Sequence, residues 1–235
     1  NADILGNVRP HPMDNDSVDI GCYEFSITSK DLDFSEIVEP NVLAVGSNSV
    51  TVGFVNFGSQ NILDKQLEIE YSIDNGNSWV FDTLKIDTLT KGGKLQFTFT
   101  KPWVVNAKGS YLLKVRIAKG LANEVDAVDE IEKEYCTGVS GQFTIGSSSS
   151  ADFSNFSEAI ASLKCGVTGP VTFNVESGTY NETIRLNEVP GMNSVNTVSI
   201  EGASKGSTII TSNWFRNLDF NGARHFVFSK LTIEI

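Results

Sequence analysis

The side chains that could perform acid–base or nucleophilic chemistry are few and widely separated. His11 and His225 lie near opposite ends of the 235-residue chain, and neither has the spacing to further ligands that a metal site needs. The sequence contains no glycine-rich phosphate loop and no Gly-x-Ser-x-Gly nucleophile elbow. We therefore predict a segment that is not an enzyme and that binds no cofactor.

The carboxylates and arginines of the C-terminal third are the remaining catalytic candidates. A polysaccharide lyase or esterase needs carboxylates beside an arginine or lysine on one face, to bind Ca²⁺ or activate a nucleophile. The candidates are scattered through predicted turns and strands, and they are Glu176, Glu182, Arg185, Glu188, Glu201, Asp219 and Arg224. Their spacing pairs none of them, so no catalytic residue is predicted in this segment.

Two acidic segments present oxygen ligands that divalent cations use. The first segment, residues 14–19, lacks the 12-residue loop and closing Glu of an EF-hand, so a plain acidic turn is the favoured interpretation. The second is favoured as a solvated loop before a strand. The two segments are Asp14, Asn15, Asp16 and Asp19, and Glu124, Asp126, Asp129, Glu130, Glu132 and Glu134. No metal site is predicted.

Residues 72–79 match the Ser-x-Asp-x-Gly-x-x-Trp pattern of the Asp boxes in sialidase propellers. Propellers repeat such boxes, and this chain has one copy. Asn75 and Gly76 lie between two alternating runs, where glycine accepts a positive φ and asparagine tolerates it. A β-hairpin turn is therefore the favoured interpretation.

Composition and charge limit the class of protein. The formal net charge is −11, from 18 Lys and Arg against 29 Asp and Glu, which argues against a nucleic-acid partner. No apolar run approaches the roughly 18 residues of a membrane span. Seven basic residues form a stretch from Lys91 to Lys119, and those from Lys91 to Lys108 lie largely at predicted turns and strand ends, which suits protection of sheet edges. A glycan- or anion-binding face is the alternative. Abundant Thr, Ser, Asn, Gly and Val predict an all-β secreted protein.

Short apolar runs separated by Gly or Asn fill the C-terminal region. Val171, Phe173 and Val175 alternate onto one face, and Ile184 and Leu186 do the same after a Ser-Gly turn signal. Strands of three to five residues cannot each build a core, but they share one if they stack as a parallel solenoid.

The middle of the chain has a different pattern. About seven alternating runs in residues 26–137 predict an antiparallel immunoglobulin-like or fibronectin-III-like β-sandwich. The runs are Ser26–Phe34, Val50–Asn56, Leu67–Ile73, Trp79–Leu84, Leu95–Thr100, Gly109–Ala118 and Glu132–Cys136.

Residues 138–169 join these regions. The spacing of Phe153, Phe156, Ile160 and Leu163 predicts a helix over about 153–164, with Asp152 as its N-cap. We expect this helix to cover the open first coil of the solenoid, whose apolar side chains and backbone groups would otherwise be exposed.

Three cysteines allow at most one internal disulfide. In a secreted protein we expect Cys136 to pair with Cys165, joining the end of the sandwich to the cap. Cys22 and Cys136 flank an odd number of predicted strands, so they should lie at opposite ends, too far apart to bond. Three free thiols are the alternative.

Two phrases resemble known β-helices. Residues 169–186, Gly-Pro-Val-Thr-Phe-Asn-Val followed by Gly-Thr-Tyr-Asn-Glu-Thr-Ile, resemble the opening coil of pectin-lyase-like right-handed parallel β-helices in large secreted or surface proteins of Bacteroidetes. Residues 19–25 resemble the phrase that closes such helices, although Cys22 replaces the usual small residue. The resemblance implies the end of a preceding β-helix at 1–25, the sandwich at 26–137, and the cap and first coils of a second β-helix at 138–235.

Residues 47–58 resemble the early strands of the adhesion-related sandwich domains called CARDB. The Asp-Ser/Thr-aliphatic pattern, which Bacteroidetes use for O-glycosylation of exported proteins, occurs at Ser17, Thr83 and Thr88. If the family assignment holds, these three residues are candidate glycosylation sites.

These observations favour a non-catalytic structural or adhesion segment of an extracellular or cell-surface protein, such as a stalk or filament. One form of this hypothesis is a repeating array, of which this segment is one period. Expected partners are neighbouring domains of the same polypeptide and surface polysaccharides or other cell-surface molecules. One alternative is the accessory part of a β-helical polysaccharide lyase or esterase, with its catalytic coils elsewhere. Another is a glycan-binding module, which needs an exposed aromatic platform; Trp79, Trp103 and Trp214 are instead expected to pack in the core or at an edge.

Overall fold

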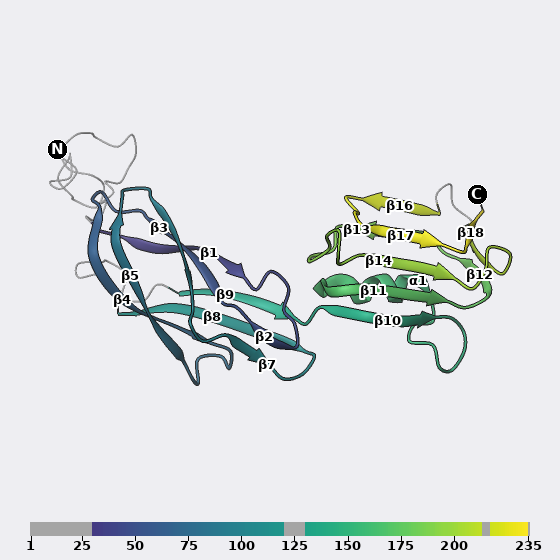
Figure 1. The fold of residues 1–235 in the computed structure, drawn as a ribbon, viewed down its shortest axis with the longest axis horizontal. Coiled ribbons are helices and arrows are strands. Elements are labelled where there is room, and N and C mark those ends of the chain that lie inside the picture. The colour runs from purple at the N-terminus through teal and green to yellow at the C-terminus, as the bar shows by residue number, and fades with distance from the viewer. Residues whose placement is uncertain (1–29, 120–129, 213–216, 235) are drawn as a thin grey trace, which may run out of the picture. The chain divides into compact units, whose positions relative to one another are not determined.

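The computed structural model describes residues 30–119, 130–212 and 217–234 (Figure 1). The described residues form eighteen β-strands, one α-helix and one 3-10 helix, and they fall into two compact units. The first unit comprises residues 30–38, 50–101, 112–119 and 130–133, and the second comprises residues 39–49, 102–111, 134–212 and 217–234. Three strands, β1 (Leu32–Glu39), β8 (Ser110–Lys119) and β9 (Glu130–Cys136), contribute residues to both units. The predicted β-helix end at residues 1–25 lies outside the described residues.

The first unit is built from two sheets (Figure 1). One has the order β1-β3-β6, and the other has the order β5-β4-β8-β9. Their bounds are Leu32–Glu39 for β1, Thr51–Asn56 for β3, Ile62–Ser72 for β4, Val80–Leu89 for β5, Lys94–Thr98 for β6, Ser110–Lys119 for β8 and Glu130–Cys136 for β9. The β3–β6, β4–β5 and β4–β8 pairs are antiparallel. Seven strands divided three and four match an immunoglobulin-like sandwich.

Alternation of side chains explains the core of this unit. Leu67, Ile69 and Tyr71 of β4 are buried, and Glu68 between them is exposed. Tyr71 packs edge-on against Phe99 with ring centroids 5.0 Å apart. The burial of each such side chain contributes roughly 1.5–3 kcal/mol to the free energy of folding.

Two details differ from the expectation, one in the first unit and one in the second. Strand β1 continues to Glu39, beyond the predicted end at Phe34, because Ile37 is also buried, and it stops before Pro40, which lacks the N–H that a longer strand needs. Residues 26–29 of the predicted strand lie outside the described residues. A further antiparallel pair, β2 (Gly46–Asn48) with β7 (Trp103–Val105), was not predicted. Three-residue strands carry too few positions for an alternation to be recognised.

The second unit contains three sheets of parallel strands. Their orders are β10-β11-β14-β17, β12-β15-β18 and β13-β16, and every pair is parallel. The bounds are Val139–Ile145 for β10, Val167–Val175 for β11, Gly178–Asn181 for β12, Ile184–Asn187 for β13, Val198–Gly202 for β14, Thr208–Thr211 for β15, Leu218–Asn221 for β16, Phe226–Ser229 for β17 and Thr232–Ile233 for β18. From β11 onward each strand pairs with the strand three positions later, so the chain visits the three sheets in turn; we call one such passage a circuit.

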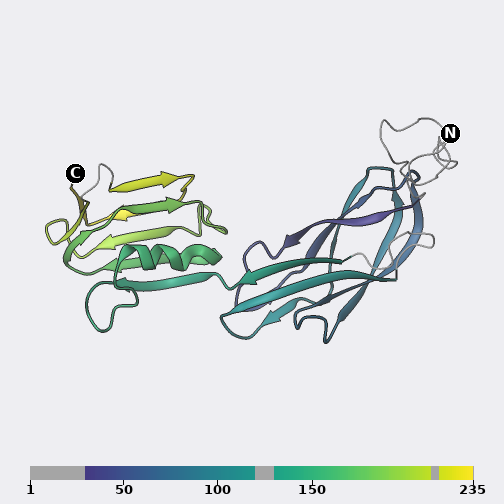
Figure 2. The same cartoon turned by 180° about the vertical axis from the view of Figure 1, so that it is seen from behind.

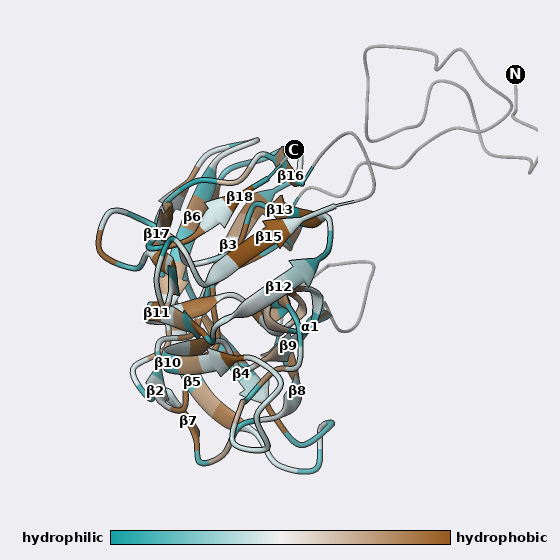
Figure 3. Ribbon diagram, turned by 90° about the vertical axis from the view of Figure 1, so that its right-hand side faces the viewer, coloured by the Kyte–Doolittle hydropathy of each residue, from teal (hydrophilic) through white to brown (hydrophobic). Residues whose placement is uncertain are grey.

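The circuits share one apolar interior. Val171, Phe173, Val175 and Ile184 are at most 3% exposed, which confirms their predicted inward orientation. Phe173 lies opposite Phe143 of β10 and Ile200 of β14. Figure 3 shows β15 as apolar (brown) and β12 as pale. The weaker pattern of β12 explains why Gly178 was predicted to be part of a turn, whereas only residues 176–177 connect β11 to β12.

The helix is shorter than predicted and begins later. Helix α1 covers Phe156–Ala161 and continues as a 3-10 helix over Ser162–Cys165 (Figure 2). Its N-cap is Asn155, whose Oδ1 accepts from the Glu158 N–H at 2.9 Å. Asp152, the predicted N-cap, instead accepts from the Thr144 N–H at 2.8 Å. Phe153 stays extended because it forms a parallel bridge with Ile145, so the helix cannot start before this bridge ends. Phe156, Ala159 and Leu163 nevertheless pack on the shared interior.

Candidate functional site

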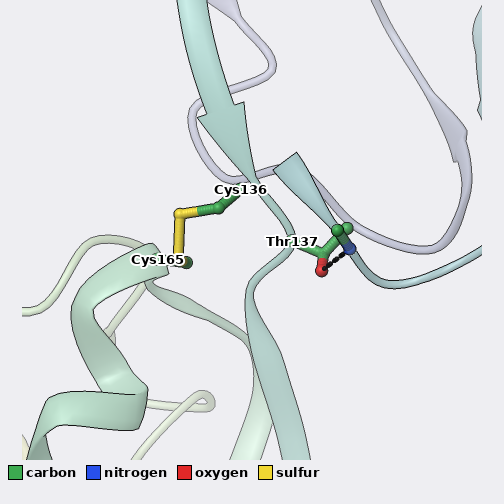
Figure 4. The surroundings of a disulfide bond; sticks show 4 residues. Cys136, Thr137 and Cys165 are labelled. Carbon is green, nitrogen blue, oxygen red and sulfur yellow. Dashed lines mark hydrogen bonds between the residues drawn. A yellow bond between two sulfur atoms is a disulfide. The ribbon is translucent and has the colours of Figure 1, made fainter. Parts of the chain in front are cut away.

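The Cys136–Cys165 pair forms a disulfide inside the second unit (Figure 4). Cys136 is the last residue of β9, and Cys165 is the last residue of the 3-10 helix. Their Cα atoms are 5.4 Å apart, within the range for this bond. Cys22 lies outside the described residues. The bond thus fixes the end of the helical segment to the end of a strand.

The Asp-box residues form the turn of the β4–β5 hairpin, which confirms the favoured interpretation. Asn75 (φ 60°) and Gly76 (φ 85°) occupy the left-handed region. Asp74 accepts hydrogen bonds from the Ser72 hydroxyl and from the backbone and side chain of Ser78. These bonds, led by the one from the Ser78 hydroxyl, lower the pKa of Asp74 to about 2. The carboxylate therefore stabilises a turn, and no substrate role follows from it.

Neighbouring charges on the same sheet are paired. Arg116 lies 2.5 Å from Glu70 and stacks on the Trp79 ring at 3.8 Å from its centroid. Lys114 contacts both Glu130 and Glu132, and the hydrogen bond to Glu132 is the main reason that the pKa of Lys114 is raised. The acidic segment therefore includes strand residues engaged with this basic side chain, and Glu124, Asp126 and Asp129 lie outside the described residues.

The candidate glycosylation residues Thr83 and Thr88 lie on β5, an edge strand of its sheet, and both are exposed. Asp82 beside Thr83 accepts from the backbone and hydroxyl of Thr100. Although partial burial alone would raise the pKa of Asp82, these hydrogen bonds and nearby Lys101 lower it. Ser17 lies outside the described residues. Sites at an exposed edge are sterically open to a modifying enzyme.

Four candidate carboxylates of the parallel unit, Glu176, Glu182, Glu201 and Asp219, have a structural partner. Glu176 accepts from the backbone and hydroxyl of Ser148, and the hydroxyl bond is the main cause of its lowered pKa. Glu182 accepts from the backbone N–H groups of Phe156 and Ser157, the first residues of α1. The ion pairs are Arg185 with Asp219 and Glu201 with Lys230.

A shallow hollow of about 310 Å³ lies beside some of these side chains, and its polar lining includes Thr144, Asn174, Glu201 and Lys230. Thr144, Asn174 and Glu201 occupy one row across three neighbouring parallel strands. Glu201 is already neutralised by Lys230 at 2.5 Å. The row can donate and accept hydrogen bonds, but it offers no free base aimed at a nucleophile.

The sequence did not indicate the role of Glu182 as a cap. Its carboxylate reaches residues 25 and 26 positions earlier, and no local pattern encodes so distant a contact. Among the described residues no group of three or more His, Cys, Asp or Glu could hold a metal ion. His225 is exposed at a positive φ of 59°, and His11 lies outside the described part of the chain.

Two tryptophan side chains are packed against other residues, whereas a phenylalanine on β5 is exposed. Trp103 is 1% exposed and packs against Tyr111 and Tyr135, and Trp79 is covered by Arg116, so both pack as expected; Trp214 lies outside the described residues. Phe81 on β5 is 65% exposed. No helix in the described ranges is long and apolar enough to cross a bilayer.

Nine chains of solved structures match this one, and they include a CARDB domain and a β-glucosidase. A CARDB domain from Pyrococcus furiosus, crystallised with di-metal ions, is 19% identical with a TM-score of 0.34, and the match covers 46% of this chain and 94% of that one. A β-glucosidase of Kluyveromyces marxianus in complex with glucose is 16% identical with a TM-score of 0.26, over 49% of this chain and 16% of that one. No protein-family model and no curated protein match the sequence.

Proposed function

We propose that this chain is a non-catalytic structural segment of a large extracellular or cell-surface protein. In this proposal an immunoglobulin-like sandwich at residues 26–137 is followed by the opening coils of a right-handed parallel β-helix at 138–235. The observation that carries it is the pairing of each strand with the strand three positions later. Such circuits form a continuous ladder with one interior, as solenoid proteins do.

Three further observations support a structural role. The helical segment covers the interior at the first circuit, as a capping element would. A disulfide favours an oxidising, extracellular compartment. The candidate catalytic groups Glu176, Glu182 and Glu201 are engaged in capping, turn and ion-pair contacts, which suits a segment that transmits or resists force better than one that performs chemistry.

The proposal is tested on the purified chain and on the intact producing cells. We expect no release of reducing ends or unsaturated uronides from a panel of neutral and acidic polysaccharides, with or without Ca²⁺. We also expect an antibody against residues 138–212 to label unpermeabilised cells and to lose its target after mild protease treatment. Turnover of any polysaccharide by this chain would overturn the non-catalytic role, and labelling only after permeabilisation would overturn the surface location.

A glycan-binding role is the second candidate, and exposed Phe81 favours it. Phe81 lies directly across from Glu70 on the outer side of its strand pair. An aromatic ring covers the apolar face of a sugar. A glycan array tests this role: specific binding by the wild type that Phe81→Ala abolishes supports it, and an array without signal removes it.

A further inference from the structure

Three glycines that are distant in sequence converge on Val42. A β-carbon added at Gly138 would lie 2.5 Å from one methyl carbon of Val42, and β-carbons added at Gly166 and Gly191 would lie 2.8 Å and 3.0 Å from the other. Side chains at these positions would clash, so only glycine allows so close an approach. We call Gly138, Gly166 and Gly191 the glycine socket. All four residues belong to the second unit.

The disulfide fixes two walls of this socket. Gly138 follows Cys136 by two residues, and Gly166 directly follows Cys165. The Val139 N–H donates to the Gly166 carbonyl at 3.0 Å, so the two walls are also joined by a backbone hydrogen bond. The two walls are therefore held by the covalent bond between the cysteines together with the first contacts of the β10–β11 pair.

The third wall and the segment that carries Val42 are held by backbone contacts. The Val167 N–H donates to the carbonyl of Pro190, next to Gly191, at 2.9 Å. Leu43, which is fully buried, forms a parallel bridge with Thr137, and its carbonyl accepts from the Gly138 N–H at 2.8 Å. The Gly138 amide thus reports directly on whether the segment is in place.

We propose that Val42 in the glycine socket is a latch that holds the segment of residues 39–49 in the second unit, and that the Cys136–Cys165 disulfide keeps this latch closed. Reduction by a dithiol cleaves the S–S bond: two electrons and two protons produce two cysteine thiols, and the dithiol becomes a disulfide. Without the covalent bond the socket is held by backbone contacts alone and opens more often, and the segment is released while the parallel ladder stays intact.

Hydrogen exchange of the whole chain, read by mass spectrometry at the Gly138 amide, tests the latch. The samples are the oxidised wild type, the wild type reduced with dithiothreitol, and Cys136→Ser/Cys165→Ser. We expect Gly138 exchange to accelerate about tenfold or more in the last two. The Val171 amide, which donates to the Thr197 carbonyl within the ladder, is the internal reference, and it should stay more strongly protected than Gly138 in every sample.

Two single substitutions in the oxidised protein separate the latch from general packing. Val42→Ala should accelerate Gly138 exchange about five- to tenfold, because it removes the methyl groups that fill the socket. Val195→Ala is the matched control, since Val195 is 71% exposed in the same unit and should leave Gly138 unchanged. Three outcomes would overturn the proposal: unchanged Gly138 exchange after verified reduction, unchanged Gly138 exchange in Val42→Ala, or Gly138 and Val171 amides that exchange at the same rate after reduction, which would mean that the whole unit opens together.

Discussion

Phe173 should be the most costly single truncation in the parallel unit. It is fully buried, and its ring lies 5.9 Å from the rings of both Phe143 and Phe153. Removing a buried phenylalanine side chain costs about 3–5 kcal/mol through lost burial and the remaining cavity. The two aromatic contacts, each worth about 0.5–1.5 kcal/mol, place Phe173→Ala in the upper half of that range.

Urea unfolding followed by far-ultraviolet circular dichroism measures this cost. With an m-value of about 2 kcal/mol/M, a loss of about 4 kcal/mol lowers the midpoint of the affected transition by about 2 M. Phe220→Ala is the matched control, because Phe220 is in the same unit and 58% exposed, and it should cost less than about 1 kcal/mol. Equal shifts for the two variants would refute the idea that the circuits share one interior.

Three more predictions concern single contacts. Cys136→Ser/Cys165→Ser should lose about 3–4 kcal/mol of unfolding free energy, from a crosslink spanning 29 residues, in urea titrations; a loss below 1 kcal/mol would contradict it. Asp74 has a pKa of about 2 when folded against 3.8 ordinarily, so its stabilisation is complete above pH 4 and disappears as the pH falls through about 2. The urea midpoint should fall less steeply over this pH window in Asp74→Asn than in the wild type. If the midpoints of the two proteins fell in parallel, the role of the Asp74 carboxylate in stabilising the turn would be refuted. Glu182→Ala should cost about 1 kcal/mol through lost capping of α1 and accelerate amide exchange at Ser157, whereas unchanged exchange would show that water replaces the carboxylate.

Patterns carried by neighbouring residues were readable from the sequence. The alternation of Val171, Phe173 and Val175 indicated both the strand and its buried face, because period two is a local property of an extended chain. The hairpin at Asn75-Gly76 was equally local, since the turn requires positive φ at these positions. The segments that form strands and the faces that they bury were therefore predictable from the sequence. The residues at which the strands begin and end were less predictable.

Features that depend on distant residues were not readable. The helix start moved to Phe156 because Phe153 is used by β10, a contact that helix periodicity cannot reveal. The glycine socket was equally hidden, since a glycine that permits close approach looks like any loop glycine until its neighbour is known. The partners of Glu176 and Glu182 follow from the circuit geometry, which the sequence indicates only in outline.

The repeated pairing at nearly constant separation has a consequence for how this unit is assembled. Ser177 contacts Ser207 across 30 residues, and Arg185 contacts Asp219 across 34. Each new circuit therefore pairs only with the circuit before it. The unit can fold circuit by circuit in the order of synthesis, because no circuit requires contacts with segments far away in the sequence. The length of the unit can therefore change without redesign of its interior. A circuit gained by duplication or lost by deletion leaves most of the other circuits with the same neighbouring circuits as before.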